Sequence, residues 1–247
     1  MDLQNLTQNV KQEFEENQQI LSFDQYLKIL EAKPKAHLRG SAQYAADMLE
    51  HFGKNEGHYR VFEGKVIGLE AVQKQIAQIL AAFAKLGINN RLILLHGPNG
   101  SAKSTLISAF MEGLGDYSHT QEGALYTFTW VFPVDRVTRG SLGIRGDQEK
   151  KSSKIQSYAF LNDEEVACVI PSELHDHPAL LIPAAEREKM LTKYEFHLPE
   201  RLKGGLSHRD HLIFQALLNS YHGDYAEVMK HIRVERFYLS KIYRSGL

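Results

Sequence analysis

Apolar side chains recur at spacings of three and four residues in several separate segments, as they do on one face of an amphipathic helix. The pattern predicts helices over residues 3–14, 22–32, 41–52, 69–83, 105–114, 184–193, 210–221 and 224–233. Ser22 with Gln25 forms a capping-box pattern, and Ser41 is placed to cap the third helix. Gly53 and Gly87 stand where the third and fourth helices stop.

Strands are expected where apolar, aromatic and β-branched residues are continuous. Leu92 to Leu95 is a short run of this kind, and Ala124 to Phe132 is a longer, aromatic one that contains Trp130. Residues 158–161 and 166–170 flank an acidic turn and are interpreted as a hairpin. Residues 136–154 are basic and rich in Gly and Ser, and they predict a loop.

The segment His96-Gly-Pro-Asn-Gly-Ser-Ala-Lys-Ser-Thr105 carries the clearest chemistry. It follows an expected strand and precedes an expected helix, which is the setting of a phosphate-binding loop. Glycines let consecutive backbone N–H groups turn toward an anion, and a helix N-terminus adds partial positive charge. The predicted site consists of Gly97, Pro98, Asn99, Gly100, Ser101, Ala102, Lys103, Ser104 and Thr105.

Each side chain of this motif has a distinct expected role. Lys103 would reach the β- and γ-phosphates, and Ser104 would bind Mg²⁺. The motif G-x-x-x-x-G-K-[ST] has glycine before the lysine, whereas this chain has Ala102. One added Cβ removes no N–H donor, so we expect Ala102 to tune phosphate binding without abolishing it.

Composition and charge narrow the class of protein. The 247 residues are 43% hydrophobic and carry a net charge of −1, which gives no case for nucleic acid or an acidic membrane surface. No run of 18 apolar residues is present, and Met1-Asp-Leu-Gln4 does not begin a secretory signal. The single cysteine, Cys168, excludes an intrachain disulfide, is expected to be buried, and agrees with a cytoplasmic location.

Two sections are expected along the chain. Residues 1–58 predict a small helical section, and Gly53 to Gly57 is the best candidate linker. Residues 59–247 predict an α/β P-loop domain, with a parallel sheet flanked by helices.

Several segments together resemble the N-terminal part of the PrkA-type serine protein kinases, which carry an AAA+ type ATPase core. They lie in order along nearly the whole chain, and only the phosphate loop among them has a chemical mechanism. The segments are 41–53, 66–70, 94–98 with Lys103 and Ser104, 176–183, 223–225 and 234–238.

The resemblance implies a fold, ligands and a reaction. The fold is of AAA+ type, ATP and Mg²⁺ are the cofactors, and Val66 with Ile67 would flank the adenine. The activity implied is transfer of the ATP γ-phosphoryl group to a serine of a protein substrate, with Lys103 as the catalytic residue. A homo-oligomer is also an expected partner, and the family's greater length implies that this chain is the first part of a longer protein.

An acidic pair that activates the nucleophile is not evident in the sequence. Glu173 is the nearest candidate, but Pro171 interrupts the strand before it. By resemblance, the acidic motif would fall beyond residue 247. Two alternatives to the kinase therefore stay open: an AAA+ motor or chaperone that remodels a protein partner, and a nucleotide-sensing module without catalysis.

Overall fold

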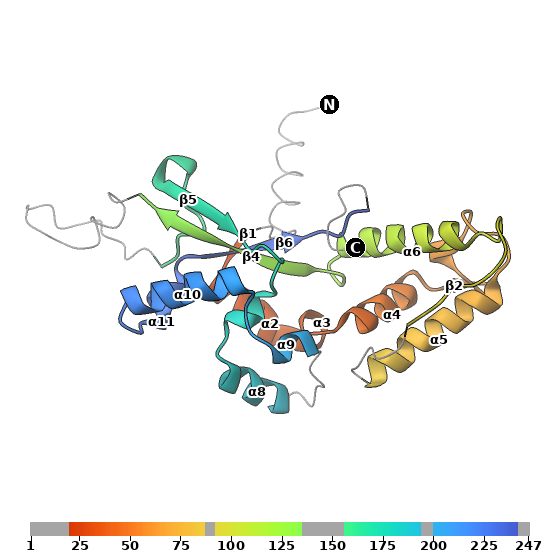
Figure 1. Cartoon of the computed structure of the whole chain (residues 1–247), viewed down its shortest axis with the longest axis horizontal. Helices are drawn as coiled ribbons and strands as arrows, with labels where there is room; N and C mark the ends of the chain where they lie inside the picture. Colours follow the sequence, from red (N-terminus) through yellow and green to blue (C-terminus); the bar gives the residue numbers. More distant parts are fainter. Residues whose placement is uncertain (1–19, 87–91, 135–155, 194–199, 242–247) are drawn as a thin grey trace, which may run out of the picture. The chain divides into compact units, whose positions relative to one another are not determined.

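The structure is a computed structural model that describes residues 20–86, 92–134, 156–193 and 200–241. The chain forms two compact units (Figure 1). Unit 1 draws on Met1–Lys33, Tyr126–Pro183 and Gly205–Arg236; unit 2 draws on Pro34–Leu125, Ala184–Gly204 and Phe237–Leu247. The boundary expected after residue 58 falls inside unit 2. The helix expected over residues 3–14 and the loop expected over residues 136–154 lie outside the described residues.

Unit 1 is built on a four-stranded sheet with the order β1-β6-β4-β5. Its strands are β1 (Ile20–Ser22), β4 (Leu125–Pro133), β5 (Val166–Pro171) and β6 (Ile232–Phe237). β1 pairs antiparallel with β6, and β5 pairs antiparallel with β4, with Trp130 opposite Ile170. Phe128, Trp130 and Val131 are fully buried, so both faces of β4 are covered.

The helices of unit 1 are α2 (Phe23–Ala32), α10 (His208–Ser220) and α11 (Tyr225–Met229), with 3₁₀ turns η2 (Asp163–Glu165) and η3 (Pro178–Leu181). The Ser22 hydroxyl accepts from Gln25 N, and the Gln25 side chain accepts from Ser22 N. This capping box begins α2 where the sequence predicted, and its apolar face buries Tyr26 and Leu30.

Unit 2 is mainly helical. Its elements are α3 (Pro34–His37), α4 (Ser41–Phe52), β2 (Lys54–Asn55), β3 (His58–Tyr59), η1 (Arg60–Phe62), α5 (Glu70–Leu86), α6 (Lys103–Ser118), α8 (Ala184–Lys193) and α9 (Glu200–Lys203). The core lies among α4, η1, α5 and α6 and contains Met48, Phe62, Leu80 and Leu106. α4 ends at Phe52 and is capped by Gly53, whose positive φ of 71° glycine adopts without strain.

The expectation of a parallel P-loop sheet is wrong. The paired strands of the described sheet run antiparallel, and residues 92–98 form no strand. Leu92 and Leu94 are 86% and 77% exposed. A strand needs a hydrogen-bonded neighbour, and the sheet that the structure describes is made of β1, β6, β4 and β5. Apolar content predicted a strand at residues 92–95, but it does not supply the partner that a strand requires.

Three smaller expectations were also wrong. The candidate linker at 53–57 belongs to the β2–β3 hairpin, in which Lys54 pairs with Tyr59. β5 pairs with β4 and not with residues 158–161. The last expected helix, 224–233, ends at Met229, and the chain then forms β6.

Candidate functional site

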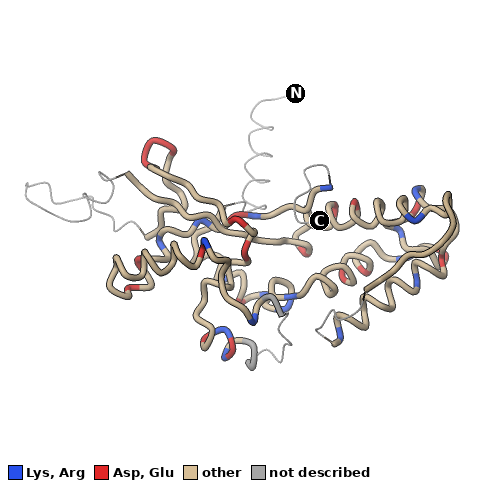
Figure 2. The backbone as a smooth tube through the Cα atoms, in the orientation of Figure 1, with Lys and Arg blue, Asp and Glu red and all other residues tan. Residues whose placement is uncertain are grey.

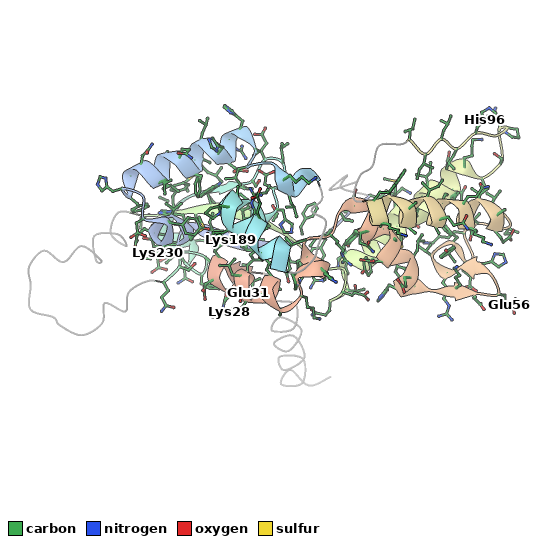
Figure 3. The ribbon with its side chains drawn as sticks, turned by 90° about the horizontal axis from the view of Figure 1, so that it is seen from below. Lys28, Glu31, Glu56, His96, Lys189 and Lys230 are labelled. Carbon is green, nitrogen blue, oxygen red and sulfur yellow. The ribbon has the colours of Figure 1, made fainter. Side chains whose placement is uncertain are left out.

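The predicted phosphate loop is a tight turn at the start of α6. Ser101 N donates to the Pro98 carbonyl at 3.4 Å, and the Ser101 hydroxyl donates to the same oxygen at 2.8 Å. Gly100 has a φ of 81°, which closes the turn in a conformation that side chains disfavour. His96, labelled in Figure 3, is exposed in the extended segment that precedes the turn.

The Lys103 side chain folds back into this turn. Its ammonium nitrogen lies 2.8 Å from Gly97 O, 2.6 Å from Pro98 O and 3.0 Å from Ser101 Oγ. All three contacts are hydrogen bonds that the ammonium group can donate. The structure therefore brings Gly97, Pro98, Ser101 and Lys103 together, with a positive charge held at the centre of the loop.

Gly97 makes this close approach possible. A Cβ built on Gly97 would lie 3.0 Å from Ser101 Oγ and 3.9 Å from Lys103 Nζ. Any side chain at this position would push against the groups that line the turn. Glycine at position 97 thus allows Ser101 and Lys103 to approach the backbone closely.

Ala102 has an unusual backbone conformation at the start of α6. It is the residue before the first helical turn and has φ 55° and ψ 19°, the left-handed conformation that costs an alanine about 1 kcal/mol. Its carbonyl accepts from Leu106 N at 2.9 Å, the first bond of the helix. The N–H groups of Lys103, Ser104 and Thr105 precede that bond and have no acceptor within the helix. The Ser104 and Thr105 side chains are exposed beside them.

The two residues expected at the adenine lie in a separate loop of unit 2. Val66 is 7% exposed and belongs to the core, whereas Ile67 is 98% exposed. An ion pair of 2.9 Å between Lys65 and Glu112 ties this loop to α6. Ile67 is thus free to contact a ligand, and Val66 packs inward beneath it.

An apolar cavity of about 340 Å³ is lined by the segment that precedes the loop, by α6, by η1 and by α5, and no sequence pattern predicted it. Alternate residues of the extended segment and one face of α6 contribute to it, together with η1 and α5. Its lining residues are Phe62, Ile76, Ile93, Leu95, Leu106, Ile107 and Phe110. In the sequence, Ile93 and Leu95 belong to the continuous apolar run Leu92–Leu95 that predicted a strand.

Acidic groups that could assist a metal are sparse. Among the described residues, no three His, Cys, Asp or Glu side chains gather as a metal site would require. Hydrogen bonds from Lys65 and Lys241 lower the pKa of Glu112, so this carboxylate is already engaged as an anion. Glu173 belongs to unit 1, where its carboxylate lies 3.8 Å from Arg209.

Basic residues do not segregate from acidic ones along the part of the backbone that the structure describes (Figure 2). Figure 2 shows acidic and basic residues interspersed along the described backbone, with an acidic stretch at η2, before β5. None of the helices in the described part of the chain has the length and apolar character of a membrane span.

Cys168 is exposed, contrary to the expectation of a buried thiol.

Comparison with known proteins gives one distant similarity. A segment of 111 residues is 30% identical to the "ATP-dependent protease PrkA" of Bacillus subtilis (strain 168). The match covers 42% of this chain and 17% of that protein, so the matched part corresponds to less than a fifth of the relative's length. No family model matches the chain, and no solved structure matches it significantly. Part of this chain is therefore distantly similar to PrkA.

Proposed function

We propose that residues Gly97–Thr105 bind the triphosphate of ATP. The observation that carries this proposal is the position of the Lys103 ammonium group, 2.8 Å from Gly97 O inside a glycine turn that opens onto α6. A phosphate oxygen would replace one of the carbonyl contacts of Lys103. The unpaired N–H groups at the start of α6 would then donate to the same anion.

Mg²⁺ fits the same place through the hydroxyl of Ser104. That side chain is exposed one residue after Lys103, and Mg²⁺ prefers oxygen ligands with several waters and phosphates retained. The ion would screen the negative charge of the triphosphate. Most of its ligands would come from ATP and water, because the described residues supply no acidic cluster.

The proposed reaction is transfer of the γ-phosphoryl group to a serine of a protein substrate. The bond between the γ-phosphorus and the bridging oxygen would break, a bond to the serine oxygen would form, ADP would leave, and the serine hydroxyl proton would pass to water. Lys103 would stabilise the negative charge on the transferring oxygens. The similarity to PrkA supports an ATP-dependent activity. Transfer to serine is supported by the resemblance of the sequence segments to the PrkA-type serine protein kinases.

A second candidate is ATP hydrolysis coupled to work on a protein partner. The printed name of the Bacillus subtilis relative, an ATP-dependent protease, favours an activity that consumes ATP and acts on protein. Here water replaces serine as the acceptor, and inorganic phosphate is the product.

Substitution of Lys103 tests the binding site. Lys103→Ala should weaken binding of ATP with Mg²⁺ about 10- to 100-fold in isothermal titration calorimetry, because it removes charge-assisted hydrogen bonds. Lys74→Ala is the matched control, since Lys74 is an exposed lysine on α5 of the same unit, and its affinity should equal that of the wild type. Equal affinity in Lys103→Ala and wild type would contradict the site.

The fate of the γ-phosphate separates the reactions. Incubation of the protein and candidate substrates with γ-labelled ATP should place label on serine if the protein is a kinase. Label found only in inorganic phosphate supports the second candidate. Tight binding with the label retained in ATP would instead indicate a nucleotide sensor.

A further inference from the structure

The apolar cavity of unit 2 is larger than the gaps between packed side chains in a protein core. Its volume is about 340 Å³, whereas voids larger than a water molecule are few in well-packed interiors. Two of its lining residues, Phe62 and Leu106, are 2% exposed and belong to the core of the unit. A third, Ile107, is 47% exposed. The cavity therefore reaches from the surface of the unit into its core.

The chemistry of the lining is uniform. Its side chains come from η1, from α5, from the extended segment before the phosphate loop and from α6, and all of them are apolar. Most are the branched aliphatic residues isoleucine and leucine. Because these side chains offer water neither a hydrogen bond nor a charge, an apolar group that displaces the water gains affinity.

The volume sets the size of a molecule that would fill the cavity. An apolar cavity of about 150 Å³ holds one benzene molecule. By the same ratio, 340 Å³ holds roughly 12 to 14 carbon atoms, and this volume lies within the range of small-molecule sites in proteins. A charged group inside would lose its water without gaining a partner, so the part of the ligand that enters must be uncharged.

We propose that this cavity is a binding site for an aliphatic chain of about 12 carbon atoms, whose polar end stays in water at the opening. The chain would contact Ile93 and Leu95 before the phosphate loop and Leu106 in the first turns of α6. It would thereby restrain both segments that flank residues 97–103. The site is distinct from the phosphate loop, and the proposal does not depend on nucleotide binding.

Two kinds of probe test the site. N-phenyl-1-naphthylamine is an uncharged dye whose fluorescence rises in apolar surroundings, and linear carboxylates of increasing chain length, kept below their micelle concentrations, compete with it. The dye should bind once per chain and the carboxylates should displace it. Each added methylene should tighten carboxylate binding about fourfold. This gain should stop at roughly 12 carbon atoms, when the cavity is full.

Two variants place the binding in the cavity. Ile107→Glu puts a carboxylate at the opening, and since Ile107 is 47% exposed the protein should still fold. Its affinity for the dye should fall about tenfold or more. Leu86→Glu is the matched control, because Leu86 is 64% exposed at the end of α5 and does not line the cavity, and it should bind the dye as wild type does. Ile93→Trp takes up space inside the cavity and should move the limit of chain length to a shorter carboxylate.

Wild-type protein that does not bind the dye would overturn the proposal, as would an Ile107→Glu protein with wild-type affinity. An affinity that keeps rising beyond about 16 carbon atoms would indicate partition onto an open surface and would also overturn it. A protein that sediments as a dimer and excludes the dye would assign the cavity to a second copy of the chain instead. None of these measurements uses ATP, so loss of the proposed nucleotide site would leave their outcome unchanged.

Discussion

The ring and the hydroxyl group of Tyr26 have opposite effects on the stability of the folded protein. Its side chain is fully buried in unit 1, with its ring 5.8 Å from that of Tyr126. Its hydroxyl has no hydrogen-bond partner within the described residues, and burial raises its pKa. The ring stabilises the fold through apolar contact, whereas the hydroxyl has lost its water without compensation.

Tyr26→Phe should therefore leave the free energy of unfolding unchanged or raise it by about 1 kcal/mol, measured by urea denaturation. Tyr44→Phe is the contrasting variant, because the Tyr44 hydroxyl donates to the Gly123 carbonyl at 2.9 Å. It should lower the free energy of unfolding by about 1 kcal/mol. A clear loss of stability in Tyr26→Phe would show that its hydroxyl has a partner after all.

His231 links stability to pH. Its imidazole is 4% exposed, with Nδ1 2.8 Å from the Val131 carbonyl and Nε2 2.7 Å from the Tyr221 hydroxyl. Burial lowers the pKa of His231 below its ordinary value of 6.5, against smaller opposing effects of Val131 and Glu227. The unfolded chain consequently takes up the proton at a higher pH than the folded protein does.

The stability that neutral His231 contributes is present above about pH 6.5 and is lost as the pH falls from there toward the lower pKa of the folded state. His231→Gln should flatten this part of the curve of unfolding free energy against pH. His222→Gln, at an exposed histidine in the same unit, should keep the wild-type slope. Identical slopes for all three proteins would contradict the assignment.

Individual helices were predictable because their signals are local. The Ser22 capping box, the glycine after Phe52 and the apolar stripe of α5 depend on neighbours within a few residues, and the structure confirms each of them. Strand pairing depends on residues far apart in sequence. Nothing local in Leu92 to Leu95 reveals whether a neighbouring strand is available.

β6 was missed for a related reason. Ile232, Val234 and Arg236 are buried while Arg233, Glu235 and Phe237 are less so, an alternation with the period of a strand. The helix predicted over residues 224–233 extended across the first residues of β6 and hid this alternation. His231 and Arg236 are buried in the structure.

The same distinction between local and long-range signals applies to the candidate site. Glycine and lysine spacing predicted the turn at residues 97–103, since those residues act through their own backbone. The apolar cavity depends on tertiary packing between elements. Gln73 lies three and seven residues before Ile76 and Leu80, so the helical period places it on the buried face of α5. Its hydrogen-bond partners, Tyr59 and Gly68, are known only from the fold.

Substitution of Gly113 tests how closely α6 packs against its neighbours. A Cβ on Gly113 would lie 2.1 Å from Val61 Cγ2 and 3.3 Å from Met48 Sδ, and valine is stiff about its first side-chain bond. Gly113→Ala should lower the free energy of unfolding by about 1–2 kcal/mol despite the better helix propensity of alanine. Asp116→Ala, at an exposed position of α6, should stay within about 0.5 kcal/mol of wild type by the same denaturation assay. A stabilised Gly113→Ala protein would show that α6 packs less tightly than described.

At the scale of the molecule, the candidate site lies within one of the two units. Every residue of the candidate site belongs to unit 2. Unit 1 has its own buried polar centre, Asp210, which accepts from Trp130 Nε1 at 2.9 Å, Ser172 Oγ at 2.6 Å and Ser207 Oγ at 2.9 Å. These bonds tie the start of α10 to β4 and to the end of β5.

Asp210→Asn should lower the free energy of unfolding of unit 1 by about 2–3 kcal/mol, because a neutral amide replaces a charged acceptor of three donors. The ATP affinity of the folded protein should be that of the wild type, measured by calorimetry below the first unfolding transition. A parallel loss of affinity would show that the ligand site depends on unit 1.

The exposed thiol of Cys168 on β5 has a practical consequence. Since the sequence contains one cysteine and that residue belongs to unit 1, a maleimide dye will attach at a single point remote in sequence from residues 97–105. The protein can therefore be labelled at one known position without a mutation. Fluorescence titrations of nucleotide can begin on the unaltered chain, before any cysteine is engineered into it.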